Sequence, residues 1–223
     1  MVHGRVYAGA TVVPRCVIIG SKLPSIVFQT VTGNSSASSS YSFTSQPIGT
    51  ASSKRYVIVA AIGPSASPST LSCTVAGNAA TSISGATARN SGIEIAMWKL
   101  LVTSGTTATI AINGTAGLSS CHIGVWALYD PLNAGVASNA TTGGSAGTSL
   151  SLNVNTALNG VGCGLVLDSA NVSWSGATED YDGLVASKWM TGASFSGAAV
   201  ATPRSVSVTC SLTGLYGNFA SFR

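Results

Sequence analysis

The residue types that could support catalysis are sparse in this chain of 223 residues. The stretch Gly143-Gly-Ser-Ala-Gly147 has the spacing of the nucleophile elbow that presents a catalytic serine in hydrolases. That elbow needs a strand before the serine and a helix after it, whereas this stretch lies in a segment rich in Gly, Ser and Thr. Only His3 and His122 are present to act as a general base. We therefore predict no enzyme activity and no catalytic residue.

A short acidic stretch, Glu179-Asp-Tyr-Asp182, holds three of the six acidic residues of the chain. Carboxylates are the ligands that calcium prefers, and a pair of them is also what glycoside hydrolysis requires. The sequence shows neither the alternating Asp/Asn pattern of a calcium loop nor a second acidic cluster. We expect a polar turn between two strands here, with calcium binding as the alternative, and we predict no metal and no cofactor.

Aromatic side chains suggest a second class of function. The four tryptophans are spread through the chain at Trp98, Trp126, Trp174 and Trp189. Indoles exposed in a row form a platform for sugar rings, and buried indoles belong to the core. We expect core positions, and we keep a carbohydrate-binding, lectin-like module as the alternative, with residues 131–147 as its long loop.

The five cysteines are far apart and form no Cys-x-x-Cys motif. Four of them fall on the apolar face of alternating segments: Cys73, Cys121, Cys163 and Cys210. This pattern is typical of reduced cysteine used as a small core residue. Cys16 belongs to the N-terminal part of the chain and is left without an assignment.

Charge is scarce as well. Charged residues make up 7% of the sequence, far below the ~25% that is usual in globular proteins. The ten basic residues are scattered, and Lys54-Arg55 is the only adjacent pair, so we predict solvated surface charge and no nucleic-acid partner. Few charges mean weak repulsion between copies, which favours dense packing of the protein in an assembly.

The longest bare apolar run, Tyr56 to Ile62, follows that basic pair. It is too short for a membrane helix, which needs ~20 apolar residues, and Gly63-Pro64 closes it. Its β-branched residues and turn boundary predict a central strand covered on both faces, which Lys54-Arg55 leads into from solvent. The first ten residues lack an apolar core of signal-peptide length, so we expect no membrane partner.

The candidate residues described above have to be positioned by secondary-structure elements, and the sequence predicts strands. Short β-rich segments are predicted at residues 11–19, 26–32, 56–62, 70–75, 92–103, 106–113, 120–129, 148–154, 160–168, 172–174, 184–189, 205–212 and 218–222. With no convincing helix, they predict an all-β fold, an antiparallel β-sandwich or jelly roll. Residues 1–40, with the tract Asn34-Ser-Ser-Ala-Ser-Ser-Ser40, are predicted to be an extended N-terminal arm, and residues 41–223 the sandwich domain.

A family resemblance runs from Tyr41 to the C-terminus. It is carried by Tyr41-Ser-Phe-Thr, Pro47-Ile-Gly-Thr, Lys54-Arg55-Tyr-Val-Ile-Val, Cys73-Thr-Val-Ala-Gly77-Asn-Ala-Ala-Thr81, Ile95-Ala-Met-Trp98, Thr103-Ser-Gly-Thr-Thr-Ala-Thr-Ile110, Ile123-Gly-Val-Trp-Ala-Leu-Tyr129 and Ala220-Ser-Phe-Arg223. In spacing and style these stretches resemble virion structural proteins of tailed bacteriophages. The resemblance leaves the first forty residues unmatched.

The resemblance implies a non-enzymatic exterior component of the head or tail, of decoration or fibre type, present in many copies in the virion. Its partners would be other virion proteins and copies of itself. A host-surface glycan is the partner implied by the lectin-like alternative.

Overall fold

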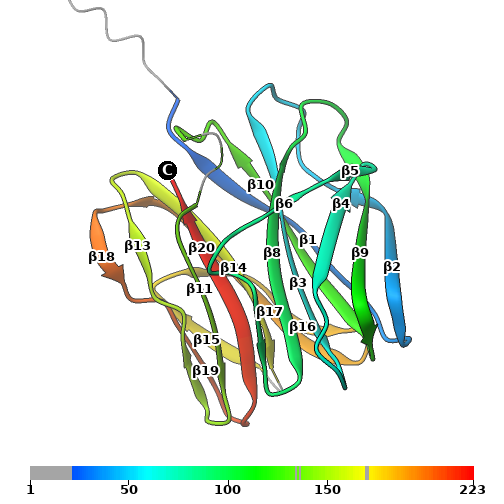
Figure 1. The fold of residues 1–223 in the computed structure, drawn as a ribbon. Coiled ribbons are helices and arrows are strands. Elements are labelled where there is room, and N and C mark those ends of the chain that lie inside the picture. Colours follow the sequence, from blue (N-terminus) through cyan, green and yellow to red (C-terminus); the bar gives the residue numbers. More distant parts are fainter. Residues whose placement is uncertain (1–21, 134, 136, 169–170) are drawn as a thin grey trace, which may run out of the picture.

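The computed structural model describes residues 22–223 except 134, 136, 169 and 170. In this part of the chain all regular secondary structure is β-strand, and every strand pair is antiparallel (Figure 1). The all-β antiparallel prediction is therefore confirmed. No helix able to cross a membrane occurs among the described residues.

The first half of the chain builds two sheets. Sheet A has the order β1 (Ser25–Asn34), β10 (Cys121–Tyr129), β3 (Arg55–Pro64), β8 (Ile93–Leu101) and β6 (Thr81–Ser82), with β7 (Ala88–Asn90) also paired to β8. Sheet B has the order β2 (Ser38–Pro47), β9 (Thr107–Leu118), β4 (Leu71–Val75) and β5 (Asn78–Ala79).

The second half builds the remaining sheets. Sheet C has the order β11 (Ala137–Ser145), β20 (Leu215–Phe222), β14 (Gly160–Asp168), β17 (Lys188–Ala198) and β16 (Thr178–Val185). Sheet D has the order β12 (Ser149–Ser151), β19 (Ser207–Cys210) and β15 (Val172–Ser175). Sheet E pairs β13 (Val154–Thr156) with β18 (Ala201–Arg204).

The two halves repeat one strand order. The order β1-β10-β3-β8 of sheet A corresponds to β11-β20-β14-β17 of sheet C, and β2-β9-β4 of sheet B corresponds to β12-β19-β15 of sheet D. In each half the first strand pairs with the last strand, β1 with β10 and β11 with β20. The last strand also pairs with an earlier strand of its half, β10 with β3 and β20 with β14. Sheets A and B of the first half, and sheets C, D and E of the second half, thus form two sandwich-like units of like topology, which we call the two sandwiches.

The sandwiches are stacked, so the sheets form four layers (Figure 1). Core 1 lies between sheets B and A, core 2 between sheets A and C, and core 3 between sheet C and sheets D and E. Successive residues of a strand face opposite sides. Val57 and Val59 therefore fill core 1, while Ile58 and Ala60 fill core 2. The prediction that this run is a central strand buried on both faces is confirmed.

The two residues of the basic pair before β3 differ in burial, which the sequence did not predict. Lys54 is exposed, but Arg55 has no exposed surface. Its guanidinium donates hydrogen bonds to four backbone carbonyl oxygens: Gly49 (2.5 Å), Val102 (2.9 Å), Ser104 (2.8 Å) and Gly105 (2.9 Å). Arg55 therefore joins two loops at one end of the first sandwich, and the prediction of solvated charge is wrong for this residue.

The predicted boundary between arm and sandwich at residue 40 stays a prediction, and the described part of the predicted arm contributes strands to the sheets. Residues 25–34 form β1, which pairs with β10 along its length and places Ile26 in core 2. The Ser-rich tract leads into β2, which begins at Ser38 and pairs with β9. Residues 1–21, which include the predicted segment at 11–19 and Cys16, lie outside the described residues.

Two other predictions change. Residues 184–189, predicted as one strand, contain the turn between β16 and β17, where Ala186 and Ser187 have positive φ (44° and 68°). The predicted long loop at 131–147 contains β11, which pairs with the C-terminal strand β20. Strand β11 was missed because glycine-rich and polar sequence is accepted in a strand when neighbouring strands supply the hydrogen bonds.

Candidate functional site

One pocket lies at one end of the first sandwich, between the edge of sheet A and β4. It has a volume of about 260 Å³. Its lining residues come from the β3–β4 connection, β4, β7 and β8: Pro68, Ser69, Thr70, Leu71, Thr87, Ala88, Arg89, Glu94 and Ile95. We call it the Arg89–Glu94 pocket.

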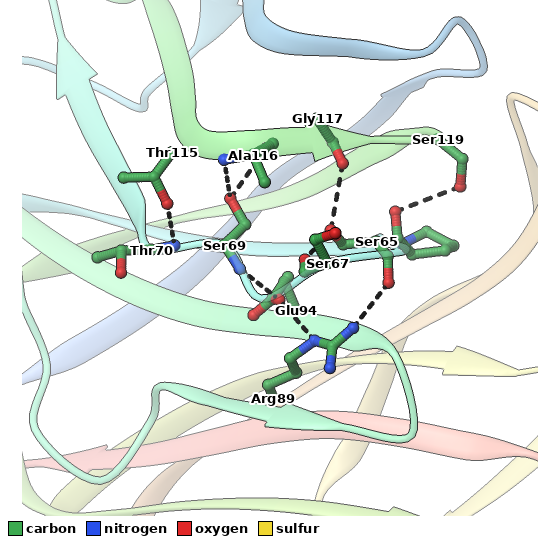
Figure 2. Close-up of polar contacts among 11 residues, drawn as sticks. Ser65, Ser67, Ser69, Thr70, Arg89, Glu94, Thr115, Ala116, Gly117 and Ser119 are labelled. Atoms are coloured by element: carbon green, nitrogen blue, oxygen red, sulfur yellow. Dashed lines mark hydrogen bonds and ion pairs between the residues drawn. The ribbon is translucent and has the colours of Figure 1, made fainter.

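An ion pair forms the centre of this pocket wall. Arg89 and Glu94 are directly opposite each other on β7 and β8, and Arg89 Nε lies 2.9 Å from Glu94 Oε1. The Glu94 side chain is 5% exposed and the Arg89 side chain is 33% exposed. Glu94 Oε1 also accepts a hydrogen bond from the backbone N–H of Ser69 (2.8 Å), as Figure 2 shows. The buried carboxylate is thus neutralised by the arginine and bonded to the β3–β4 connection.

The β3–β4 connection is held in place by hydroxyl groups (Figure 2). Ser69 Oγ donates to the carbonyl of Ala116 (2.9 Å) and accepts from its N–H (3.1 Å), so this side chain replaces a strand partner for the end of β9. Thr115 Oγ1 accepts from the N–H of Thr70 (2.9 Å). Arg89 Nη2 donates to the carbonyl of Ser65 (2.9 Å). These hydrogen bonds connect the side chains of the pocket wall to the backbone around them.

The predicted acidic turn is part of a strand. Glu179, Asp180 and Asp182 lie on β16, at the edge of sheet C. Asp180 accepts hydrogen bonds from Trp126 Nε1 (2.9 Å) and Ser194 Oγ (2.9 Å). Asp182 accepts from Trp189 Nε1 (2.7 Å) and from the N–H of Val172 (3.2 Å). These carboxylates link strands and sheets.

Electrostatics in this acidic segment follow from burial. Burial raises the pKa of Asp180, and the hydrogen bonds from Trp126 and Ser194 offset part of that rise. Burial, then the charge of Asp182, raises the pKa of Glu179. Within the described part of the chain, no three His, Cys, Asp or Glu side chains are grouped so that they could hold a metal ion.

The tryptophans do not form a row of exposed rings. Trp98 and Trp126 are buried, as expected. Trp174 and Trp189 are half-buried, and the indole N–H of Trp174 donates to Thr191 Oγ1 (2.8 Å). The aromatic platform considered from the sequence is therefore not present in this arrangement.

The buried positions predicted for four cysteines are confirmed: Cys73, Cys121, Cys163 and Cys210. Burial raises the pKa of Cys73 and of Cys121 to about 12, with the neighbouring Cys73 contributing at Cys121. Burial also raises the pKa of Cys163 well above its usual value. These three thiols stay protonated at neutral pH, which makes them poor nucleophiles.

The other residues considered for catalysis lie apart from the pocket. Gly143 and Gly144 belong to β11, opposite Gly217 and Tyr216 of β20. His122 is buried in β10, where its Nε2 lies 3.1 Å from Ser120 Oγ. Burial, and secondarily the charge of Lys188, lowers the pKa of His122 to about 4. His3 lies outside the described residues.

The Arg89–Glu94 pocket was missed by sequence reasoning, although one signal was available. Glu94 lies in the apolar segment Ile93-Glu-Ile-Ala-Met-Trp98, which was correctly predicted as a strand. A carboxylate within a buried strand requires a partner, and an unpaired one would be very costly. The partner, Arg89, stands on a three-residue strand that has no pattern of its own.

Comparison with known proteins gives little to build on. No family model matches the chain, and no curated protein matches it. Among solved structures, one similarity is to an anti-sigma factor domain-containing protein, with a TM-score of 0.24 and 9% sequence identity over 82% of this chain and 74% of that chain. At this TM-score the similarity supports no conclusion about fold or function.

Proposed function

We propose that this chain is a non-enzymatic structural component of a tailed-phage virion, an exterior protein of decoration or fibre type attached to the head or tail. The observation that carries the proposal is the strand order of the two sandwiches. A jelly roll consists of eight strands in two sheets, and it recurs in viral capsid and lectin domains. The orders β1-β10-β3-β8 in sheet A and β2-β9-β4-β5 in sheet B, four strands in each of two sheets, support this assignment. We infer that each half of the chain is a jelly roll.

The use of polar groups in the interior supports a structural role. Arg55 joins loops, Asp180 links core 2 to β17, and Ser69 pairs with the end of β9. Both middle sheets are covered on two faces, so a large share of the chain serves to build a rigid body. With a net charge of only +4, copies of this body can pack closely without strong repulsion.

Incorporation into particles tests the proposal. Epitope-tagged full-length chain would be produced during infection, and its copy number in purified virions would be measured by quantitative mass spectrometry. We expect many copies per particle, accessible to antibody on the outside. A chain that stays in the soluble fraction and is absent from particles would refute the proposal.

The N-terminal attachment is tested in the same assay. Residues 1–21 are the part of the predicted arm that precedes β1 and the sheets. A chain starting at residue 22 keeps all twenty strands found among the described residues, and it should lose incorporation if residues 1–21 form the attachment. Wild-type copy number for this variant would move the attachment to the sandwiches themselves.

The lectin-like alternative is not supported by the tryptophans, since two are buried and two are half-buried. Residues 131–147, its other expected component, contain strand β11. Sugar recognition would need a different site.

A further inference from the structure

We infer that the Arg89–Glu94 pocket binds a neutral, hydroxyl-rich ligand, of which a hexose ring of a glycan is the class that fits. This inference does not depend on a place in a virion. It rests on unused hydrogen-bonding capacity, on fixed geometry and on the balance of charge in the pocket wall.

Both members of the ion pair have hydrogen-bonding groups to spare. Among the described residues, hydrogen bonds to the Glu94 side chain go to Oε1, and the Arg89 guanidinium donates through Nε and Nη2. The second carboxylate oxygen can accept further bonds, and Nη1 can donate them. Both residues line the pocket, so these groups are within reach of a ligand that enters it.

The wall is also preorganised. Arg89 is held by Glu94 on one side and by the carbonyl of Ser65 on the other (Figure 2). The Ser69 N–H fixes Glu94 from the β3–β4 connection. A ligand therefore does not have to order these side chains, which removes part of the entropic cost of binding.

Charge balance selects the class of ligand. The carboxylate and the guanidinium cancel, so an anion or a cation entering the pocket would leave a net charge in a partly desolvated place. A hydroxyl group can accept from Arg89 and donate to Glu94. The apolar lining atoms of Pro68, Leu71 and Ile95 can contact the C–H face of a sugar ring.

Size and lining set the expected affinity. The volume of about 260 Å³ is just below the ~300–1,000 Å³ of common small-molecule sites, so one ring is the natural occupant. The lining residues include no aromatic ring. We expect a millimolar Kd for a single site, and a lower apparent Kd where several copies bind one glycan-bearing surface together.

The test is a titration of the full-length chain, followed by protein NMR, with the methyl glycosides of glucose, galactose and mannose. N-acetylneuraminic acid and inorganic phosphate serve as anionic probes. We expect saturable shifts with at least one neutral glycoside, confined to residues 65–71 and 87–95, and no comparable binding of the anions.

Two variants locate the site. Thr70→Trp places a large ring at the exposed rim, where the Thr70 side chain makes no hydrogen bond in the described part of the chain, and it should abolish binding. Glu94→Gln keeps an acceptor for Ser69 but loses the charge, and it should weaken binding about tenfold, as expected for one charge-assisted hydrogen bond. Thr109→Trp makes the same change on exposed β9 outside the pocket and should bind like wild type.

The inference is overturned if no neutral glycoside gives saturable shifts, if an anion binds more tightly than every glycoside, or if Thr70→Trp binds like wild type. Because Thr70→Trp removes no hydrogen bond, its result remains informative even if Glu94→Gln is too unstable to study. Absence of the chain from virions would leave this inference standing, so the two proposals fail separately.

Discussion

At the scale of single residues, the structure uses its few charges to bond backbone. Arg55 is the extreme case, because one buried guanidinium bonds carbonyl oxygens before β3 and after β8. An arginine can do this because its planar group carries five donors in fixed directions. A chain with little charge can thus still depend strongly on one charged residue.

Replacing Arg55 by methionine should therefore be severe. Four carbonyl oxygens would lose their donor at a fully buried position, and we expect the free energy of unfolding to fall by about 3–5 kcal/mol. Urea unfolding followed by circular dichroism measures this loss. Lys54→Met is the matched control, because Lys54 is exposed, and it should stay within ~0.5 kcal/mol of wild type. Equal losses for the two variants would contradict the role given to Arg55.

His122 should make stability depend on pH. Its pKa is about 4 in the folded chain and near 6.5 when unfolded, so between these values the unfolded chain binds a proton that the folded chain does not. Stability should therefore fall as pH falls from about 6.5 to about 4, by up to about 3 kcal/mol from this residue.

The comparison with His122→Gln isolates this contribution. Glutamine does not titrate, so the variant should lose less stability than wild type when the pH is lowered from 7 to 4.5. Urea unfolding at these two pH values measures the loss, and they span roughly the interval between the two pKa values of His122. Asp180, whose pKa is raised by burial, titrates in both proteins and largely drops out of the difference. The same pH dependence in both proteins would show that His122 is not buried in its neutral form.

At the scale of elements, the two halves solve one problem alike. In each half, a carboxylate on a middle sheet accepts a backbone N–H at or shortly before the start of an outer-sheet strand. That strand is β4 in the first half and β15 in the second. Glu94 bonds Ser69 in the first half, and Asp182 bonds Val172 in the second (2.8 Å and 3.2 Å). Arginine completes the first arrangement and the indole of Trp189 the second. Only the first leaves a charged pair on a pocket wall.

The first strand tests the predicted boundary of the sandwich at residue 40. A chain of residues 41–223 lacks β1 and the start of β2, so β10 loses a partner and core 2 loses Ile26. We expect this chain to melt at a lower temperature than a chain of residues 22–223, or to aggregate. Thermal unfolding and gel filtration of the two make the comparison. Identical melting temperatures would mean that residues 22–40 are dispensable for the fold, as an arm would be.

At the scale of the whole molecule, core 2 is what makes the halves one body. It is built from sheet A residues such as Trp126 and Met97 and sheet C residues such as Leu165 and Phe222. Neither half can bury these side chains alone, and large exposed apolar faces promote association. The two sandwiches should therefore unfold together in one transition.

Cutting the chain between β10 and β11 tests this dependence. Fragments 22–133 and 137–223 keep every strand intact, yet each exposes one face of core 2. Expressed singly they should be insoluble or should self-associate, and expressed together they should co-purify as a folded pair. Two soluble fragments that melt cooperatively and ignore each other would show that each sandwich is an independent domain.

The sequence by itself determined which segments form strands and which faces of those strands are buried, because local patterns encode both. The apolar run of β3, the alternation around the cysteines and the alternation of Ile93, Ile95 and Met97 in β8 predict strands and the faces they bury, because a strand repeats every two residues.

Only the tertiary structure decided the rest. Arg55 is buried because loops near residues 49 and 104 meet it, and the Arg89–Glu94 pocket exists because residues 65–71, 87–89 and 94–95 converge. The stacking of the two sandwiches likewise depends on which buried faces meet. Such contacts join residues far apart in the chain, so local periodicity says that a face or a charge must find a partner but does not say which partner it finds.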